Sequence, residues 1–149
     1  MTIDKAFRVR KAKWPEDLAA LRSIREPVFV EEQKVPLELE WDDDDPVCIH
    51  VIAEDADGRP IGTGRLAADG KIGRMAVHQE WRGKGVGGAI LQALLDEARY
   101  QNIPECYLHG QTAALDFYGR YGFEAEGEEF DEADIPHRMM RLRFPGGDS

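Results

Sequence analysis

Cysteine is scarce in this chain, and long apolar runs are missing from it. Its 149 residues include only Cys48 and Cys106, which are too few for a disulfide framework and form no CxxC pair. No apolar run approaches the ~20 residues that a membrane-spanning helix needs. The first residues also lack the apolar segment of a secretory signal. We therefore expect a soluble, cytoplasmic protein that makes no membrane contact.

Basic residues are outnumbered by acidic residues. Lys and Arg number 19 against 29 Asp and Glu, which gives a formal net charge of −10. Such a surface repels nucleic acid and anionic lipid, so an anionic ligand would have to be bound by local chemistry. Length and a hydrophobic content of 42% indicate one domain over residues 1–149, with 145–149 as a frayed tail.

Metal-binding patterns are likewise missing. The sequence holds no HExxH motif, and Cys48 and His50 supply only two candidate ligands within one expected strand. Asp43, Asp45 and Glu54 imitate part of a calcium loop, but Cys48 occupies the position that requires glycine. We therefore expect no metal site, and we interpret His50 and Cys106 as packed strand residues.

The patterning that is present predicts an α/β fold. Alternating or continuous apolar segments predict strands at 7–10, 49–53, 61–67, 71–77, 105–109, from 123 onward, and at 137–144. Helices are expected to begin at Trp14, at Val28 after an interruption by Pro27, after Gly88, and at Ala113. The acidic stretch 38–46, with four consecutive aspartates, is predicted to be a solvated loop.

A glycine-rich turn between an expected strand and a strongly amphipathic helix is the clearest functional signal. Glycines let the backbone approach a ligand closely, and the start of the following helix attracts anions, so residues 82–88 are suited to bind phosphate. A P-loop is excluded because the GxxxxGK[ST] pattern is absent. The GxGxxG pattern of a dinucleotide-binding fingerprint is present, but that fingerprint follows its strand directly, whereas five residues separate the first glycine from the strand here. The acidic residue expected at the end of the next strand instead precedes that strand.

Two motifs resemble the GCN5-related N-acetyltransferase (GNAT) family. Arg82, Gly85 and Gly87 match its Arg-x-x-Gly-x-Gly pattern, and 114–123 resembles the family's later Leu-x-Phe-Tyr…Gly-Phe segment. More loosely, the chain is similar to the ElaA-like and YjcF-like subgroup. The resemblance implies a mixed, mostly antiparallel sheet that splays between its fourth and fifth strands, flanked by helices. It also implies that acetyl-CoA is the cosubstrate.

The resemblance further implies which residues contact acetyl-CoA. Its pantetheine arm would pair with fourth-strand backbone, and its pyrophosphate would lie on the glycine turn. Gln111 stands where family members often place Asn. The implied cofactor-binding residues are Met75, Ala76, Val77, Arg82, Gly83, Lys84, Gly85, Val86, Gly87, Gly88 and Gln111.

Acetyl transfer to an amine requires a neutral amine, a polarised carbonyl and a proton for the leaving thiolate. By resemblance, Tyr118 would be the general acid, and a fourth-strand N–H, from Val77 or a neighbour, would polarise the carbonyl. Glu32 is the candidate base. On the acceptor side, Asp44 and its neighbours in the aspartate run would attract a cationic amine, and His137 would line the cleft.

These residues favour an N-acetyltransferase that acts on a small, cationic amine by direct attack in a ternary complex. A non-catalytic acyl-CoA-binding module is the alternative, and a dinucleotide-binding protein is a third hypothesis. The sequence leaves open whether the acceptor is instead a protein terminus or a lysine side chain. It also leaves open whether the protein forms a homodimer, because no residue requires one.

Overall fold

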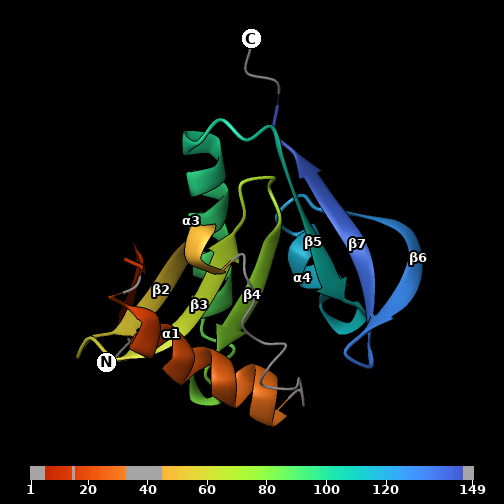
Figure 1. The fold of residues 1–149 in the computed structure, drawn as a ribbon. Coiled ribbons are helices and arrows are strands. Elements are labelled where there is room, and N and C mark those ends of the chain that lie inside the picture. The colour runs from red at the N-terminus through yellow and green to blue at the C-terminus, as the bar shows by residue number, and fades with distance from the viewer. Residues whose placement is uncertain (1–5, 15, 33–44, 146–149) are drawn as a thin grey trace, which may run out of the picture.

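Two antiparallel sheets lie side by side in the computed structural model, with one long helix behind them and one across the front of the larger sheet (Figure 1). The structure describes residues 6–14, 16–32 and 45–145, and of residues 30–32 the backbone alone. We call the side of the sheets away from the long helix α3 (Val86–Tyr100) the front. Mixed α/β architecture, as predicted, is confirmed.

The larger sheet is an antiparallel meander of four strands, which form where the sequence predicts strands at 7–10, 49–53, 61–67 and 71–77. Its spatial order is the chain order, with the turn at residues 69–70 joining the last two strands. Alternate residues of its second strand face α3 and the front helix, so the strand is buried on both sides. The strands are β1 (Phe7–Lys11), β2 (Ile49–Asp55), β3 (Pro60–Leu66) and β4 (Ile72–Val77).

The smaller sheet has three strands in the order β5-β7-β6. They are β5 (Glu105–Gln111), β6 (Glu124–Glu132) and β7 (Ile135–Arg143). β6 is its outer strand and exposes five carboxylates, from Glu124, Glu128, Glu129, Asp131 and Glu132.

The two sheets touch at one end and separate at the other. Lys71 and Tyr107 form an isolated parallel bridge, and the Tyr107 N–H donates to the Gly70 carbonyl at 3.0 Å. Beyond that junction the register of β4 on β3 shifts, so that Arg74 and Met75 together oppose Gly64. Arg74 takes a left-handed φ of 50° there. Such a bulge bends its strand, and β4 diverges from β5 as the expected splay requires (Figure 1).

Helix α3 packs on the back of the sheets through one apolar stripe. Its buried residues are Val86, Ile90, Leu91, Leu94, Leu95 and Ala98, which recur at helical spacing and include the stripe expected from the sequence. The helix begins at Val86, within the glycine-rich segment, rather than after it. Short helical segments connect the remaining elements: η2 (Asp45–Val47), η3 (Gln79–Trp81), η4 (Thr112–Ala114) and α4 (Leu115–Gly119).

The front helix changes type at Pro27 rather than breaking there. α1 (Leu18–Arg25) continues directly into a π-helical segment, η1 (Glu26–Glu32). Proline lacks an N–H, so the Ser23 carbonyl cannot receive the usual bond from residue 27. His78 Nε2 donates to that carbonyl instead, at 3.1 Å. This bond ties the front helix to the chain just after β4.

The prediction of a solvated loop is wrong for Asp45. Its side chain is buried, with a residue exposure of 1%, and its Oδ1 lies 2.8 Å from Nη1 of both Arg25 and Arg65. Arg25 is fully buried at 0% exposure. Because charges leave water only when they are paired, these opposite charges from three separate segments are buried together. Asp43 and Asp44 lie outside the described residues.

His50 completes this buried cluster as a neutral side chain. Its Nε2 donates to the Asp45 carbonyl at 2.8 Å, and its ring stacks on Trp14 with centroids 5.3 Å apart. Burial lowers the pKa of His50 because it disfavours the charged imidazolium. The interpretation of His50 as a satisfied core histidine is confirmed.

The start of α1 gives a pH-dependent prediction. Arg10 donates two hydrogen bonds of 2.9 Å to the Asp17 carboxylate, which lowers the pKa of Asp17 to about 2. The carboxylate form is therefore favoured by folding, and its stabilisation is lost as pH falls from about 4 to about 2. We expect Asp17→Asn to lower the free energy of unfolding at pH 7 by about 1–2 kcal/mol.

Urea titrations of both proteins at pH 7, 4 and 2.5 test this prediction. The difference between them should shrink as the wild-type carboxyl becomes protonated. A difference that stays constant down to pH 2.5 would show that the Asp17 charge contributes nothing.

Among the described residues, each helix is too short or too polar to cross a membrane.

Candidate active site

A pocket of about 660 Å³ lies where the start of α3, the end of β4 and the helix α4 meet. Most of the glycine-rich turn lines this pocket, together with aromatic and basic side chains from the second motif. Its lining residues are Val77, Trp81, Arg82, Gly83, Gly85, Val86, Gly87, Gly88, Phe117, Arg120 and Tyr121.

The floor of the pocket is backbone at the beginning of α3. Gly83 and Gly85 have left-handed φ values of 77° and 86°, which residues with side chains rarely adopt, and Gly85 caps the helix. The N–H groups in the first turn of a helix have no partner within that helix. Together with the positive end of the helix dipole, they make this backbone suitable for an anion such as a phosphate.

Two arginines supply positive charge at the same pocket. Arg82 is oriented by a hydrogen bond of 2.9 Å from its Nε to the Val77 carbonyl. The guanidinium of Arg120 lies 6.0 Å from the centre of the Phe117 ring, within the range of a cation–π contact. In a chain of net charge −10, this local charge favours an anionic ligand here.

The predicted site did not include Trp81, Phe117, Arg120 or Tyr121. Three of them belong to the quoted segment 114–123, so the motif itself was the available signal. Tyr121, two residues beyond the end of α4, places its hydroxyl against Gly88 of α3. A Cβ at Gly88 would overlap its hydroxyl, so a larger residue at 88 would displace the Tyr121 side chain from this position.

The end of β4 offers backbone groups to the gap between the sheets. The His78 N–H donates to the Ile61 carbonyl at 2.9 Å, which pairs residue 78 with β3. Hydrogen-bonding direction alternates along an antiparallel strand, so the N–H and carbonyl of Val77 point away from β3. The bond from Arg82 to that carbonyl agrees with this direction.

Tyr118 lies behind β5, beside this gap. Its ring packs against Gly110, where a Cβ would sit 3.3 Å from the Tyr118 Cδ2, and meets Phe123 with centroids 6.2 Å apart. Burial raises the pKa of Tyr118, so the phenol keeps its proton at neutral pH. A protonated hydroxyl is the form that a general acid requires.

Four predicted cofactor-binding residues do not line the pocket. Lys84 is exposed on the turn, and Gln111 ends β5. Met75 packs toward α3, while Ala76 is buried on the opposite side with the front helix. The backbone N–H and carbonyl of Ala76 point toward β3, because Ala76 stands two positions before His78, which pairs with β3.

The predicted acceptor residues are not brought together by the described part of the chain. Glu32 is the last residue of η1, and only its backbone is described; Asp44 lies outside the described residues. His137 is buried in β7, with 6% exposure, where its Nδ1 donates to the Ile135 carbonyl at 2.6 Å. Its ring stacks on Phe130 on the front of the smaller sheet.

Metal ligation has no support from the described residues, where no three His, Cys, Asp or Glu side chains come together.

Comparison with known proteins gives one consistent family. The acetyltransferase (GNAT) domain profile matches residues 46–144. N-acetyltransferase YjcF of Bacillus subtilis is 38% identical over 133 residues, which cover 87% of this chain and 94% of that protein. An acyl-CoA N-acyltransferase structure from Pseudomonas aeruginosa is 33% identical, with a TM-score of 0.82, and covers 92% of this chain and 99% of its own.

Escherichia coli ElaA has the same fold, with 27% identity and a TM-score of 0.81 over 91% of this chain and 99% of its own. The order of elements, the splay between β4 and β5 and the glycine turn at α3 thus occur in a chain whose sequence matches one enzyme family. The protein belongs to the GNAT family of N-acetyltransferases, whose members use acyl-CoA.

Proposed function

We propose that this protein transfers an acetyl group from acetyl-CoA to the amine of a small, cationic acceptor. The observation that carries the proposal is the pocket at the start of α3, which combines helix N–H groups, Arg82 and Arg120 next to the exposed edge of β4. An elongated ligand with a phosphate end fits this arrangement.

Acetyl-CoA would bind in two parts. Its pyrophosphate would lie on the amides of the glycine turn near Arg82 and Arg120, and its pantetheine arm would run along β4 toward the junction with β5. The outward N–H and carbonyl of Val77 are suitably placed to pair with the amides of pantetheine, and the gap leads on past Tyr118.

The chemistry would proceed by direct attack, with both substrates bound. Holding the amine and the thioester together supplies much of the acceleration. A β4 backbone N–H, from Val77 or a neighbour, would polarise the carbonyl. Tyr118 would donate its proton to the departing thiolate sulfur. Glu32, Asp44 and His137 remain our candidates for shaping the acceptor site.

A thermal-shift titration with acetyl-CoA, CoA and NAD tests the donor site. A ligand that binds only the folded state at 100 times its Kd adds about 2.7 kcal/mol of stability. We expect this shift with acetyl-CoA and CoA but not with NAD, and a smaller shift for Arg82→Ala because one phosphate contact is lost. Arg143→Ala, which removes an exposed arginine far along β7, is the matched control.

Release of free thiol from acetyl-CoA in the presence of a panel of amines then tests turnover. Acetylation of small cationic amines supports the proposal, whereas acetylation of peptides alone would replace the acceptor class. Tight CoA binding without thiol release would identify a non-catalytic acyl-CoA-binding module, and an absence of CoA binding would refute the donor assignment.

A further inference from the structure

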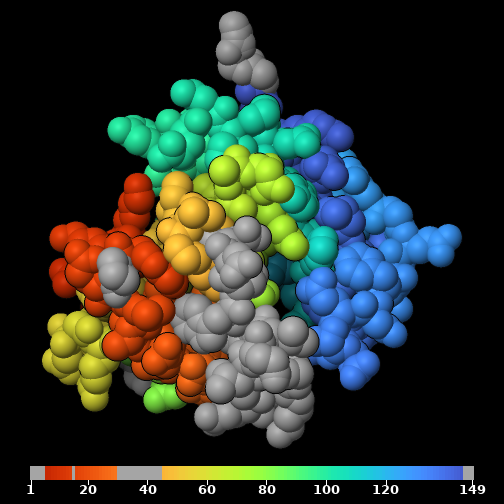
Figure 2. Space-filling model, viewed as in Figure 1, coloured from red at the N-terminus to blue at the C-terminus, as the bar shows by residue number. Residues whose placement is uncertain are grey.

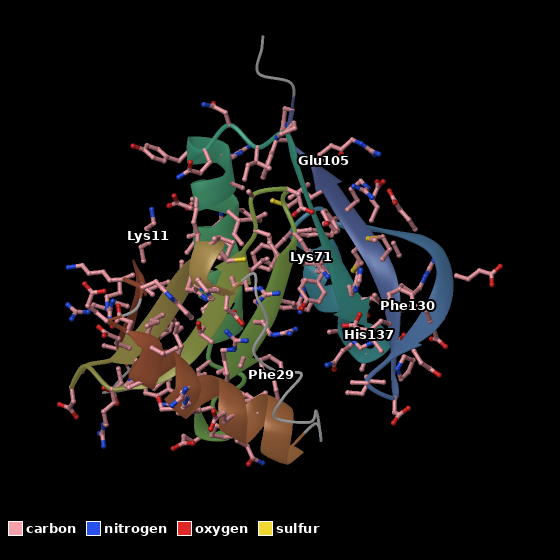
Figure 3. All side chains as sticks on the ribbon, in the orientation of Figure 1. Lys11, Phe29, Lys71, Glu105, Phe130 and His137 are labelled. Atoms are coloured by element: carbon pink, nitrogen blue, oxygen red, sulfur yellow. The ribbon has the colours of Figure 1, made fainter. Side chains whose placement is uncertain are left out.

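A histidine–carboxylate pair lies on the front of the smaller sheet, on the side opposite Tyr118. His109 of β5 approaches Glu132 of β6, with 2.8 Å between Nδ1 and Oε1. Phe130 meets the His109 ring edge-on, with centroids 5.2 Å apart, and stacks on His137. Figure 3 shows Phe130 and His137 side by side on β6 and β7. The ring of His109 is therefore held by a carboxylate and an aromatic face.

This contact determines which nitrogen of His109 can accept a proton. A carboxylate has only acceptors, so Nδ1 must carry a hydrogen and donate it to Glu132. In the neutral ring the lone pair is then on Nε2. The side chain is 24% exposed, so the ring is partly open to solvent and to a ligand on the front of the sheet. An imidazole oriented through Nδ1 by a carboxylate is the arrangement that enzymes use for a general base.

The position of His109 along β5 places it at the narrow end of the gap. Tyr107 forms the bridge that joins the two sheets, and His109 is the next residue of β5 that faces the front. Gly110, its neighbour, faces the back, where a Cβ would sit 3.3 Å from the Tyr118 ring. A proton donor and a proton acceptor thus lie on opposite faces of β5, one residue apart along the strand.

Acetyl transfer needs a proton acceptor near the incoming amine and a proton donor near the leaving sulfur. These are two different positions, because the amine attacks the carbonyl carbon from outside the carbonyl plane, whereas the sulfur lies in that plane. Figure 2 shows the front face, with the β6–β7 hairpin in blue on one flank and the front helix in red and orange on the other. An acceptor that enters from the front would meet His109, whereas the sulfur would lie toward Tyr118.

We propose that His109, oriented by Glu132, is the catalytic base that takes a proton from the acceptor amine; this inference rests on the proposed acetyltransferase function. The ammonium gives one proton to Nε2 of His109. The freed lone pair forms the N–C bond to the acetyl carbon as the C–S bond breaks, and Tyr118 protonates the thiolate. Once the N–C bond has formed, the amine nitrogen loses its second proton to the Tyr118 oxygen, which restores the phenol. His109 then releases its proton to solvent.

Charged and titratable groups from the neighbouring strands surround His109. Glu132 faces His109 from β6. His137 of β7 stacks on Phe130, which in turn contacts the His109 ring. Arg141 of β7 opposes Tyr107, and its Nη1 donates to the Glu105 carboxylate at 2.8 Å. Glu132 is the carboxylate in contact with the ring, and it fixes the orientation of the imidazole. Removing this contact should therefore lower kcat while leaving the KM for acetyl-CoA unchanged.

The experiment compares wild type, His109→Gln, Glu132→Gln and the control Asp131→Asn in pH profiles of kcat/KM for the acceptor. Asp131 neighbours Glu132 but lies on the other face of β6. We expect His109→Gln to lose about 100-fold at pH 7 and less near pH 10, where the amine loses its proton in bulk solution. Glu132→Gln should lower kcat without changing the KM for acetyl-CoA, and Asp131→Asn should match the wild type. All four should give the same thermal shift with acetyl-CoA.

Wild-type turnover by His109→Gln across the whole pH range would overturn the proposal and leave the acetyltransferase function intact. A defect confined to acetyl-CoA affinity, with normal turnover at saturating donor, would overturn it as well. A wild-type protein that binds acetyl-CoA and acetylates no amine would instead refute the proposed function, and this inference with it. Glu132→Gln gives an independent test, since a wild-type kcat in this variant would exclude the pair from proton transfer.

Discussion

Replacing Asp45 with alanine should lower the free energy of unfolding by about 3–5 kcal/mol, because it leaves two buried guanidinium groups without this carboxylate. Arg25 and Arg65 each place Nη1 at 2.8 Å from the same oxygen. Water cannot replace the carboxylate readily, since Arg25 is fully buried and Arg65 nearly so. For a chain of this size the loss corresponds to a Tm lower by about 10–15 °C.

Urea denaturation of Asp45→Ala and of Asp57→Ala measures this effect against a matched control. Asp57 also pairs with an arginine, Arg59, but both side chains are largely exposed. Exposed pairs contribute about 0–1 kcal/mol, so Asp57→Ala should resemble the wild type. Equal effects of the two substitutions would show that burial of the Asp45 cluster does not contribute to stability.

Removing the Tyr118 hydroxyl should slow acetyl transfer strongly while leaving the cofactor bound. We expect Tyr118→Phe to reduce kcat by about 100-fold, since a positioned general acid contributes at least that factor in many enzymes. The ring would keep its packing against Gly110 and Phe123, so the fold and the acetyl-CoA site should be preserved. Steady-state kinetics with saturating acetyl-CoA, combined with thermal shifts, separates the two properties.

Tyr100→Phe is the corresponding control, because Tyr100 is largely exposed at the end of α3 and distant in sequence from the pocket residues. It should turn over at the wild-type rate. Wild-type kcat in Tyr118→Phe would eliminate the hydroxyl as the proton donor. A loss of acetyl-CoA binding in that variant would assign Tyr118 a role in the cofactor site instead.

The strands, the long helix and the glycine-rich turn were predictable from the sequence because each has a local pattern. Alternating or continuous apolar segments located the strands of the larger sheet, and the apolar stripe located α3, because both are local patterns with a fixed period. Gly83 and Gly85 predicted the tight turn because few other residues adopt its backbone conformation.

Features that depend on distant segments were not predictable in this way. Asp45 belongs to an acidic run and becomes buried only because Arg25 and Arg65, each 20 residues away, are brought to it by the fold. Likewise, His109 and Glu132 are 23 residues apart in sequence, and they lie on β5 and β6, with β7 between these strands in the sheet. No periodicity marks such pairs, since their energy comes from tertiary proximity.

The carboxylates exposed along β6 bear on how copies of this protein meet one another. The outer strand of a sheet presents unpaired backbone groups that a strand from a second molecule could continue. Two β6 strands brought together would set carboxylate against carboxylate, and like charges directly opposite are destabilising. This charged edge therefore opposes fibre-like growth from sheet to sheet.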